Sequence, residues 1–179
     1  MTMTRALRML AVVPFIACAA ACATGSAERP KIGALAPAFS LETTAGKKAQ
    51  LSDYAGKTLV LAFFPKAFTG GCTQEMKGYQ ATQPKFVEGD AQILGVSVDD
   101  LETQKKFAES LGLQFPLMSD PEGTAAKAYG VYGMMGLKLA ARTTFVIDGT
   151  GHVVQIIEGK DAIDPASALE ACPLHKKGT

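Results

Sequence analysis

One cysteine stands where a protein chain can make a thiol reactive. Cys72 follows an apolar, strand-like run that ends at Pro65, and the pair Gly70-Gly71 directly before it permits tight backbone geometry. A polar, helix-compatible stretch starts at Cys72, so the pattern predicts a thiol at a helix N-terminus. There, unpaired backbone N–H groups and the positive end of the helix dipole stabilise a thiolate, which is the nucleophilic form of cysteine. We therefore predict that Cys72 is reactive rather than inertly packed.

The elements around Cys72 alternate between strands and helices, as judged from apolar periodicity and bounding turn residues. We expect a β-hairpin within 31–52, strands over 59–64, 92–98, 143–147 and 152–158, and helices over 72–81, 101–111, 120–129 and from about 165. The run 148–151, Asp-Gly-Thr-Gly, predicts a tight connection between the last two strands. This order predicts an α/β fold, a thioredoxin-like sandwich with a mixed central sheet and an N-terminal β-hairpin.

Five motifs in family order resemble the peroxiredoxins of the alkyl hydroperoxide reductase and thiol-specific antioxidant superfamily, most closely the bacterioferritin-comigratory, or Q-type, branch. The first is the active-site signature Pro65-x-x-x-Thr69-x-x-Cys72. The others are the runs 94–99, 115–123, 128–131 and 142–148, and the similarity covers about 32–171. The resemblance implies a thiol-dependent peroxidase that reduces hydrogen peroxide and organic hydroperoxides through a Cys72 sulfenic acid, without a cofactor.

The resemblance also implies roles for the residues around Cys72. Thiolate attack on a peroxide places negative charge on the departing oxygen, and Thr69 and Arg142 are the donors expected to stabilise it. Pro65 is expected to shield the sulfur and fix the loop. Glu75 matches a common acid of this branch that orients the loop or Arg142, while a solvated acid favourable to the helix dipole is the alternative.

Two positions depart from the family pattern. Many Q-type relatives have Pro-Gly where this chain has Gly70-Gly71, and many carry a resolving cysteine where this chain has Lys77. Cys172 is the remaining candidate resolving thiol, and simple packing in the last helix is its alternative. We expect a one-cysteine route in which an external thiol, such as a thioredoxin-like protein, reduces the sulfenic acid.

Two other functions are weighed against the peroxidase. A thioredoxin-like thiol-disulfide exchange protein would normally carry Cys-x-x-Cys, but Glu75 occupies the second cysteine position. A copper-binding envelope lipoprotein is suggested by Cys72-x-x-x-Met76, which supplies only two ligands. His152 and His175 are too scattered to add a metal site, so we predict no metal.

Residues 1–23 read as a secretory signal peptide, followed by a linker over 24–31 and a single peroxiredoxin domain over 32–175. The segment has a basic start at Arg5 and Arg8, then an apolar run that is too short for an ordinary membrane span. Cys22 follows three alanines and is a candidate for lipidation, with ordinary signal cleavage as the alternative. We expect export to the periplasm or to a lipid anchor in the bacterial envelope.

The charge balance excludes a nucleic-acid partner. Removing Arg5 and Arg8 with the signal segment leaves 16 basic and 17 acidic residues, a net charge of −1. With Cys18 and Cys22 cleaved away or lipidated, only Cys72 and Cys172 remain as thiols, which excludes a disulfide-dense scaffold. The expected partners are a peroxide and a thiol reductant, with a membrane contacted only through the candidate anchor. The chain is expected to be a monomer or a homodimer.

Overall fold

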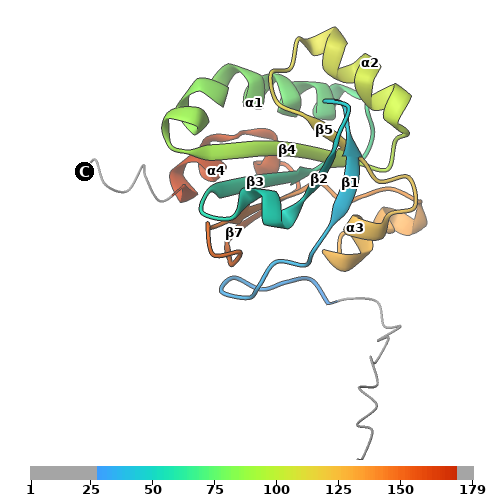
Figure 1. The fold of residues 1–179 in the computed structure, drawn as a ribbon. Coiled ribbons are helices and arrows are strands. Elements are labelled where there is room, and N and C mark those ends of the chain that lie inside the picture. The colour runs from blue at the N-terminus through green and yellow to red at the C-terminus, as the bar shows by residue number, and fades with distance from the viewer. Residues whose placement is uncertain (1–27, 173–179) are drawn as a thin grey trace, which may run out of the picture.

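The computed structural model describes residues 28–172 of the chain (Figure 1). The expected signal peptide with Cys22, and His175 near the other end, lie outside these residues. None of the helices in the described part is long and apolar enough to cross a membrane.

The centre of the fold is one mixed sheet of seven strands in the order β2-β1-β5-β4-β3-β6-β7. Strand β3 pairs parallel with β4, and β4 pairs parallel with β5, whereas the remaining neighbours are antiparallel. The mixed central sheet predicted from the sequence is therefore confirmed. The strands are β1 (Ser40–Thr43), β2 (Lys48–Gln50), β3 (Thr58–Phe63), β4 (Ala91–Ser97), β5 (Leu117–Ser119), β6 (Thr143–Ile147) and β7 (Val153–Glu158).

Helices cover both faces of the sheet, because each face carries an apolar cluster that must be shielded from water. The longest helix, α1 (Gly70–Glu88), packs on one face together with α2 (Leu101–Leu111) and α4 (Ala166–Ala171). The opposite face is covered by α3 (Thr124–Ala128), and Figure 1 shows α2 and α3 on opposite sides of the sheet. Single 3₁₀ turns complete the chain, namely η1 (Leu51–Tyr54), η2 (Met134–Gly136) and η3 (Asp161–Ile163).

Strand β3 positions the predicted site because it lies in the interior of the sheet and leads directly to Cys72. All six of its residues are buried, as expected for a strand covered on both faces. Strand β6 runs antiparallel beside it, and Thr143 pairs with Phe63 at the end of β3. The residue before β6, Arg142, is thereby brought to the edge of the sheet from which the chain continues to Cys72.

The helix after β3 is longer than the sequence predicted. We expected a helix over 72–81, but α1 begins at Gly70 and continues through Pro84 to Glu88. Pro84 lies on the exposed side, whereas Phe86 is fully buried against Tyr79 with 5.9 Å between the ring centroids. The packing of Phe86 outweighs the backbone hydrogen bond that a proline removes.

The segment expected to form a helix over 120–129 begins with a turn instead. The backbone N–H of Gly123 donates to the carbonyl of Asp120 at 2.8 Å, and Gly123 adopts a left-handed conformation with φ of 64°. The Asp120 carboxylate then accepts from the backbone N–H of Thr124 and of Ala126, at 2.7 and 2.9 Å. Asp120 therefore anchors the start of α3 from upstream, and the helix is shorter than predicted.

Most other predicted bounds agree with the structure within one residue. Helix α2 and strand β6 have the predicted limits, and Gly112 ends α2 with a φ of 58°. Strand β5 was not predicted, because it has three residues and follows Pro116. Cys172 is the first residue after α4 rather than a member of that helix.

The depth of α1 on the sheet depends on a glycine in β4. A Cβ atom on Gly95 would lie 2.5 Å from Leu117 Cδ2 and 3.3 Å from both Met76 Sδ and the ring of Phe64. We expect Gly95→Ala to lower the free energy of unfolding by about 1–3 kcal/mol, because overpacking forces neighbours apart. The measurement is urea unfolding followed by circular dichroism.

Gly70→Ala is the matched control, because a Cβ atom there has no neighbour within 4 Å. Its stability should equal or slightly exceed that of the wild type, since alanine is the better helix former. Equal stabilities for Gly95→Ala and the wild type would show that the packing between α1 and β4 is looser than described.

Candidate active site

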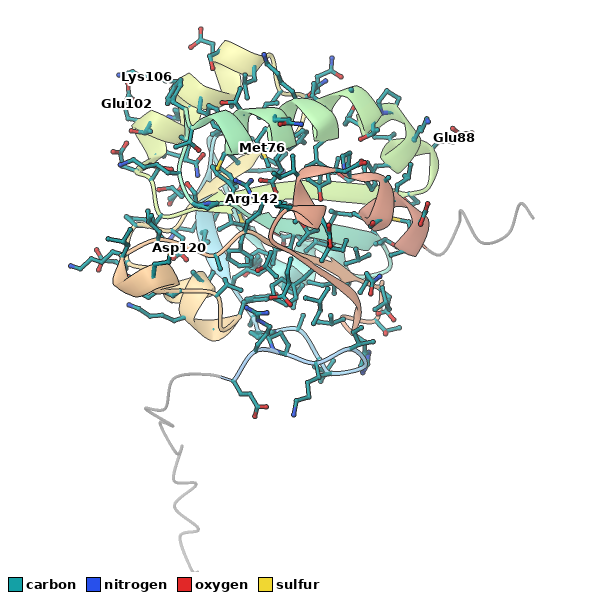
Figure 2. All side chains as sticks on the ribbon, turned by 180° about the vertical axis from the view of Figure 1, so that it is seen from behind. Met76, Glu88, Glu102, Lys106, Asp120 and Arg142 are labelled. Atoms are coloured by element: carbon teal, nitrogen blue, oxygen red, sulfur yellow. The ribbon has the colours of Figure 1, made fainter. Side chains whose placement is uncertain are left out.

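The Cys72 sulfur lies in the first turn of α1 and directly faces a cationic side chain. Cys72 is 0 % exposed, and Arg142 donates from Nη2 to its Sγ at 3.2 Å. Figure 2 shows Arg142 near the middle of the molecule, below Met76 of α1 in this view. The guanidinium thus presents a permanent positive charge and an N–H donor to the sulfur.

The N-terminus of α1 also leaves donors available around this sulfur. The first helical hydrogen bond runs from the N–H of Thr73 to the carbonyl of Thr69 at 2.8 Å, so the N–H groups of residues 70–72 precede the helical ladder. Thr69 is the N-cap residue but makes no capping bond with its side chain, and the first turn contains no acidic residue. These donors are therefore not neutralised within the helix and can stabilise an anionic atom at its start.

Arg142 is held on both sides, so its orientation is fixed. Its Nη1 donates to Oε2 of Glu75, and its backbone carbonyl accepts from the N–H of Gly159 at 3.0 Å. The side chain is only 13 % exposed. Gly71 makes room for it, because a Cβ atom at that position would lie 3.1 Å from Nη2. The predicted pairing of Cys72 with Arg142 is thus present in the structure.

Glu75 is fully buried, which decides between the two interpretations of this residue. Its carboxylate accepts from Arg142, and its Oε1 has no hydrogen-bond partner among the described residues. Burial raises the pKa of Glu75 to about 8, and the positive charge and hydrogen bond of Arg142 offset part of that rise. Glu75 therefore orients Arg142 and is not a solvated acid on the helix surface.

Thr69 and Pro65 lie on the loop before α1. Thr69 was expected to act as a donor at the sulfur and Pro65 to shield it, but neither residue is hydrogen-bonded to Cys72 in this structure. The hydroxyl of Thr69 donates to the carbonyl of Lys66 at 2.9 Å, so in this structure it braces the loop and is not bonded to the sulfur. Pro65 is half-buried and lines a surface hollow of about 520 Å³ together with Arg142 and Thr143. Another cleft, of about 400 Å³, lies elsewhere, beside Phe39. Its lining contains none of the predicted site residues.

A carboxylate that the sequence reasoning missed holds the loop between β3 and α1. Asp99 Oδ2 accepts from the backbone N–H of Ala67 at 2.8 Å and from the hydroxyl of Ser97 at 2.7 Å. Phe68, the residue after Ala67, has a positive φ of 63° and packs on Phe107 of α2 with 5.0 Å between ring centroids. The motif over 94–99 could have indicated this contact. Because β4 runs parallel to β3, a carboxylate just after β4 lies at the edge of the sheet where β3 ends.

The second thiol lies on the same sheet face but in an unreactive setting. Cys172 is buried, its Sγ donates to the carbonyl of Ala168 at 3.3 Å, and burial raises its pKa to about 11. Cys72 and Cys172 are both free in this structure. Lys77 is exposed on α1.

The described residues hold no cluster of three or more histidine, cysteine or acidic side chains that could bind a metal ion. His152 is instead engaged through Nδ1 with the hydroxyl of Thr150 at 2.8 Å. Met76 is buried in the apolar cluster beneath α1.

This chain is similar to known proteins in both sequence and structure. Residues 32–156 match the model of the AhpC/TSA family. Peroxiredoxin Bcp of Bacillus subtilis is 38 % identical over 133 residues, which cover 70 % of this chain and 83 % of the relative. The crystal structure of peroxidoxin BcpB from Mycobacterium tuberculosis has a TM-score of 0.74 at 34 % identity, covering 84 % of this chain and 99 % of that one.

A further solved structure is the bacterioferritin comigratory protein of Xanthomonas campestris, determined to explain the alkyl peroxide reduction activity of that protein. Its TM-score is 0.71 at 33 % identity, and the match covers 76 % of this chain and 91 % of that one. These matches confirm the thioredoxin-like fold predicted from the sequence. The chain therefore belongs to the AhpC/TSA family and is a peroxiredoxin of the Bcp or Q type, a thiol-dependent peroxidase.

Proposed function

We propose that this peroxiredoxin reduces hydrogen peroxide and organic hydroperoxides by direct attack of the Cys72 thiolate. The observation that carries the proposal is the 3.2 Å contact between Arg142 Nη2 and Cys72 Sγ at the start of α1. A thiolate held beside a guanidinium and free helix N–H groups is an activated nucleophile with donors already in place.

The chemistry is a displacement on oxygen. The thiolate forms an S–O bond with the terminal oxygen of ROOH, the O–O bond breaks, and its electron pair leaves on RO⁻, which takes a proton from water. The products are the Cys72 sulfenic acid and ROH. Arg142 and the N–H groups of residues 70–72 stabilise the charge that develops on the departing oxygen.

Organic hydroperoxides are included among the substrates because a sizeable hollow lies beside Arg142, the residue that contacts Cys72. The hollow of about 520 Å³ next to Pro65 and Arg142 has room for an organic substituent on the peroxide. The alkyl peroxide reduction activity of the Xanthomonas campestris relative supports the same substrate class.

An external thiol, such as that of a thioredoxin-like protein, completes the cycle. Reduction of a sulfenic acid requires an attacking thiolate, and the high pKa of buried Cys172 keeps this thiol protonated near neutral pH. No cysteine occupies position 77, where the resemblance would put a resolving thiol. The proposed route therefore uses Cys72 alone.

We also propose that the chain is exported, with Cys22 as a candidate lipidation site. The support is the basic start, the short apolar run and the small residues before Cys22. The mass of the mature protein distinguishes the two forms, because lipidation adds acyl chains to Cys22 whereas ordinary cleavage does not. A full-length mass of the exported or membrane-bound chain would contradict processing.

The role of Arg142 predicts a large kinetic effect. Arg142→Ala should lower the second-order rate constant for peroxide reduction about 100-fold or more, as for other lost electrostatic stabilisers. Arg142→Lys keeps the charge but lacks the planar guanidinium that contacts both Cys72 and Glu75. Its rate constant should therefore lie between those of the wild type and Arg142→Ala. Cys72→Ser should be inactive.

The measurement is peroxide consumption with a thiol reductant in excess. Lys77→Ala serves as the control. Lys77 is exposed on α1, so this substitution removes a nearby positive charge without changing a contact of the site. A rate for Cys72→Ser equal to that of the wild type would overturn the proposed mechanism.

The buried Glu75 predicts a pH dependence of stability. Its folded-state pKa of about 8 lies above the ordinary 4.5, so the unfolded chain binds fewer protons between these values. The contribution of Glu75 to stability is therefore full below pH 4.5 and declines as the pH rises toward 8, by at most about 1.4 kcal/mol per pH unit.

Glu75→Gln should lack this decline, because the amide does not titrate. Urea unfolding of both proteins across pH 4.5 to 8 measures the difference, and all other groups cancel in the comparison. Parallel stability curves would show that Glu75 keeps the same charge throughout this range.

The one-cysteine route predicts that Cys172 is dispensable. Cys172→Ala should retain peroxidase turnover with an external thiol, and peroxide-treated wild type should gain one oxygen on the peptide that contains Cys72. Intact and peptide mass spectrometry provide the measurement. A Cys72–Cys172 disulfide, seen as a loss of two hydrogens, would instead identify Cys172 as the resolving thiol.

A further inference from the structure

The loop that leads from β3 to the first turn of α1, residues 64–69, is held in a conformation that it would not adopt alone. Phe68 has φ of 63°, in the left-handed region that costs a residue with a Cβ atom about 1–2 kcal/mol. Its side chain is 56 % exposed, so burial within the core does not impose this conformation. A strained backbone of this kind persists only where the surroundings hold it.

The holding contacts come from a polar cluster formed by Ser97 at the end of β4, Asp99 just after it and Gln104 on α2, here called the loop anchor. Asp99 Oδ2 accepts from the N–H of Ala67, one residue before Phe68, at 2.8 Å. Bonds to a charged acceptor are about twice as strong as bonds between neutral groups. The loop is therefore tied to the sheet next to its strained residue.

The loop anchor is itself fixed from several sides. The hydroxyl of Ser97 donates to Asp99 Oδ2 at 2.7 Å and accepts from Nε2 of Gln104 at 2.7 Å. Gln104 is fully buried and also donates to the carbonyl of Met118 at 3.0 Å. The hydroxyl of Ser119 donates to the backbone carbonyl of Asp99 at 2.8 Å. Asp99 is thus a rigid support for Ala67.

Catalysis makes two opposite demands on this loop. Attack on peroxide needs the bond between Arg142 and Cys72 described above, with only enough movement around the buried sulfur to admit a peroxide oxygen. Reduction by an external thiol needs a second sulfur within bonding distance of Cys72, which a fully buried atom does not allow. The loop and the first turn of α1 must therefore open after each oxidation.

We propose that Asp99 is a positioning residue that sets the balance between these two steps by latching the 64–69 loop through Ala67. The inference rests on the proposed function, because it assigns the recovery of Cys72 to an external thiol. The latch speeds oxidation by keeping the loop closed, and it slows recovery by opposing the movement that exposes the sulfenic acid.

Two rates on the same protein test the proposal. The first is oxidation of reduced Cys72 by hydrogen peroxide. The second is capture of the preformed sulfenic acid by dithiothreitol, in which Cys72–SOH and a thiol give a mixed disulfide and water. Rapid quenching with peptide mass spectrometry follows both rates and separates Cys72 from Cys172. Intrinsic tryptophan fluorescence does not serve here because the chain contains no tryptophan.

Asp99→Ala should slow the oxidation and accelerate the capture, each about tenfold, because tenfold equals only about 1.4 kcal/mol of latch energy. Asp99→Asn retains an oxygen that can accept from Ala67, so it should shift both rates in the same directions by less. This variant also keeps the test decisive if Asp99→Ala does not fold.

Asp100→Ala is the matched control. Asp100 is the neighbouring carboxylate, and it caps α2 by accepting from the N–H of Thr103 at 2.8 Å without a bond to the loop. Its loss destabilises the protein by about the amount typical of a helix cap but should leave both rates unchanged. Opposite shifts in the Asp99 variants, absent in this control, support the latch.

Three results would overturn the latch. They are unchanged rates in the Asp99 variants, a fall of both rates together, or the same shifts in Asp100→Ala. A failure of the proposed function looks different, because wild-type Cys72 would then not be oxidised by peroxide at all.

Discussion

The structure depends on a buried guanidinium shared between a sulfur and a carboxylate. Arg142 donates to Cys72 with one nitrogen and to Glu75 with the other, and little of its side chain meets water. A charge removed from water is costly unless it is paired, so each member of this triad requires the others. The buried Glu75 would be an isolated carboxyl without Arg142, and Arg142 would be free to turn away from the sulfur without Glu75.

Sheet topology, rather than sequence proximity, brings these groups together. Cys72 and Glu75 follow β3, whereas Arg142 precedes β6 about 70 residues later. The antiparallel pairing of these strands places the end of β3 beside the start of β6. Asp99 arrives at the same edge because β4 runs parallel to β3. Any change in the register of β3 against β6 would move Arg142 relative to the sulfur.

Sequence patterns predicted those features of the site that depend on residues close together in the chain. The break at Pro65, the glycine pair and the following polar stretch placed Cys72 at a helix start, and the structure agrees. The buried state of Glu75 could not be predicted in this way, because an acidic residue near the start of a helix is usually solvated and the covering group, Arg142, comes from the residue before β6. The bond from Ala67 to Asp99 likewise spans 32 residues. The predicted end of α1 was wrong because it too depends on tertiary packing. Phe86 packs against Tyr79 beyond Pro84, a residue type that normally interrupts a helix.

Position 77 bears on how the oxidised sulfur can recover. Residues five apart on an α-helix point about 140° away from each other, so a cysteine at this exposed position would face away from buried Cys72. Joining two such sulfurs would require the first turns of α1 to unwind. With Lys77 there, the helix beyond its first turn can remain folded, and only the loop and that turn need to move for an external thiol. The anchoring of this loop, rather than the stability of α1, then governs access to the sulfur.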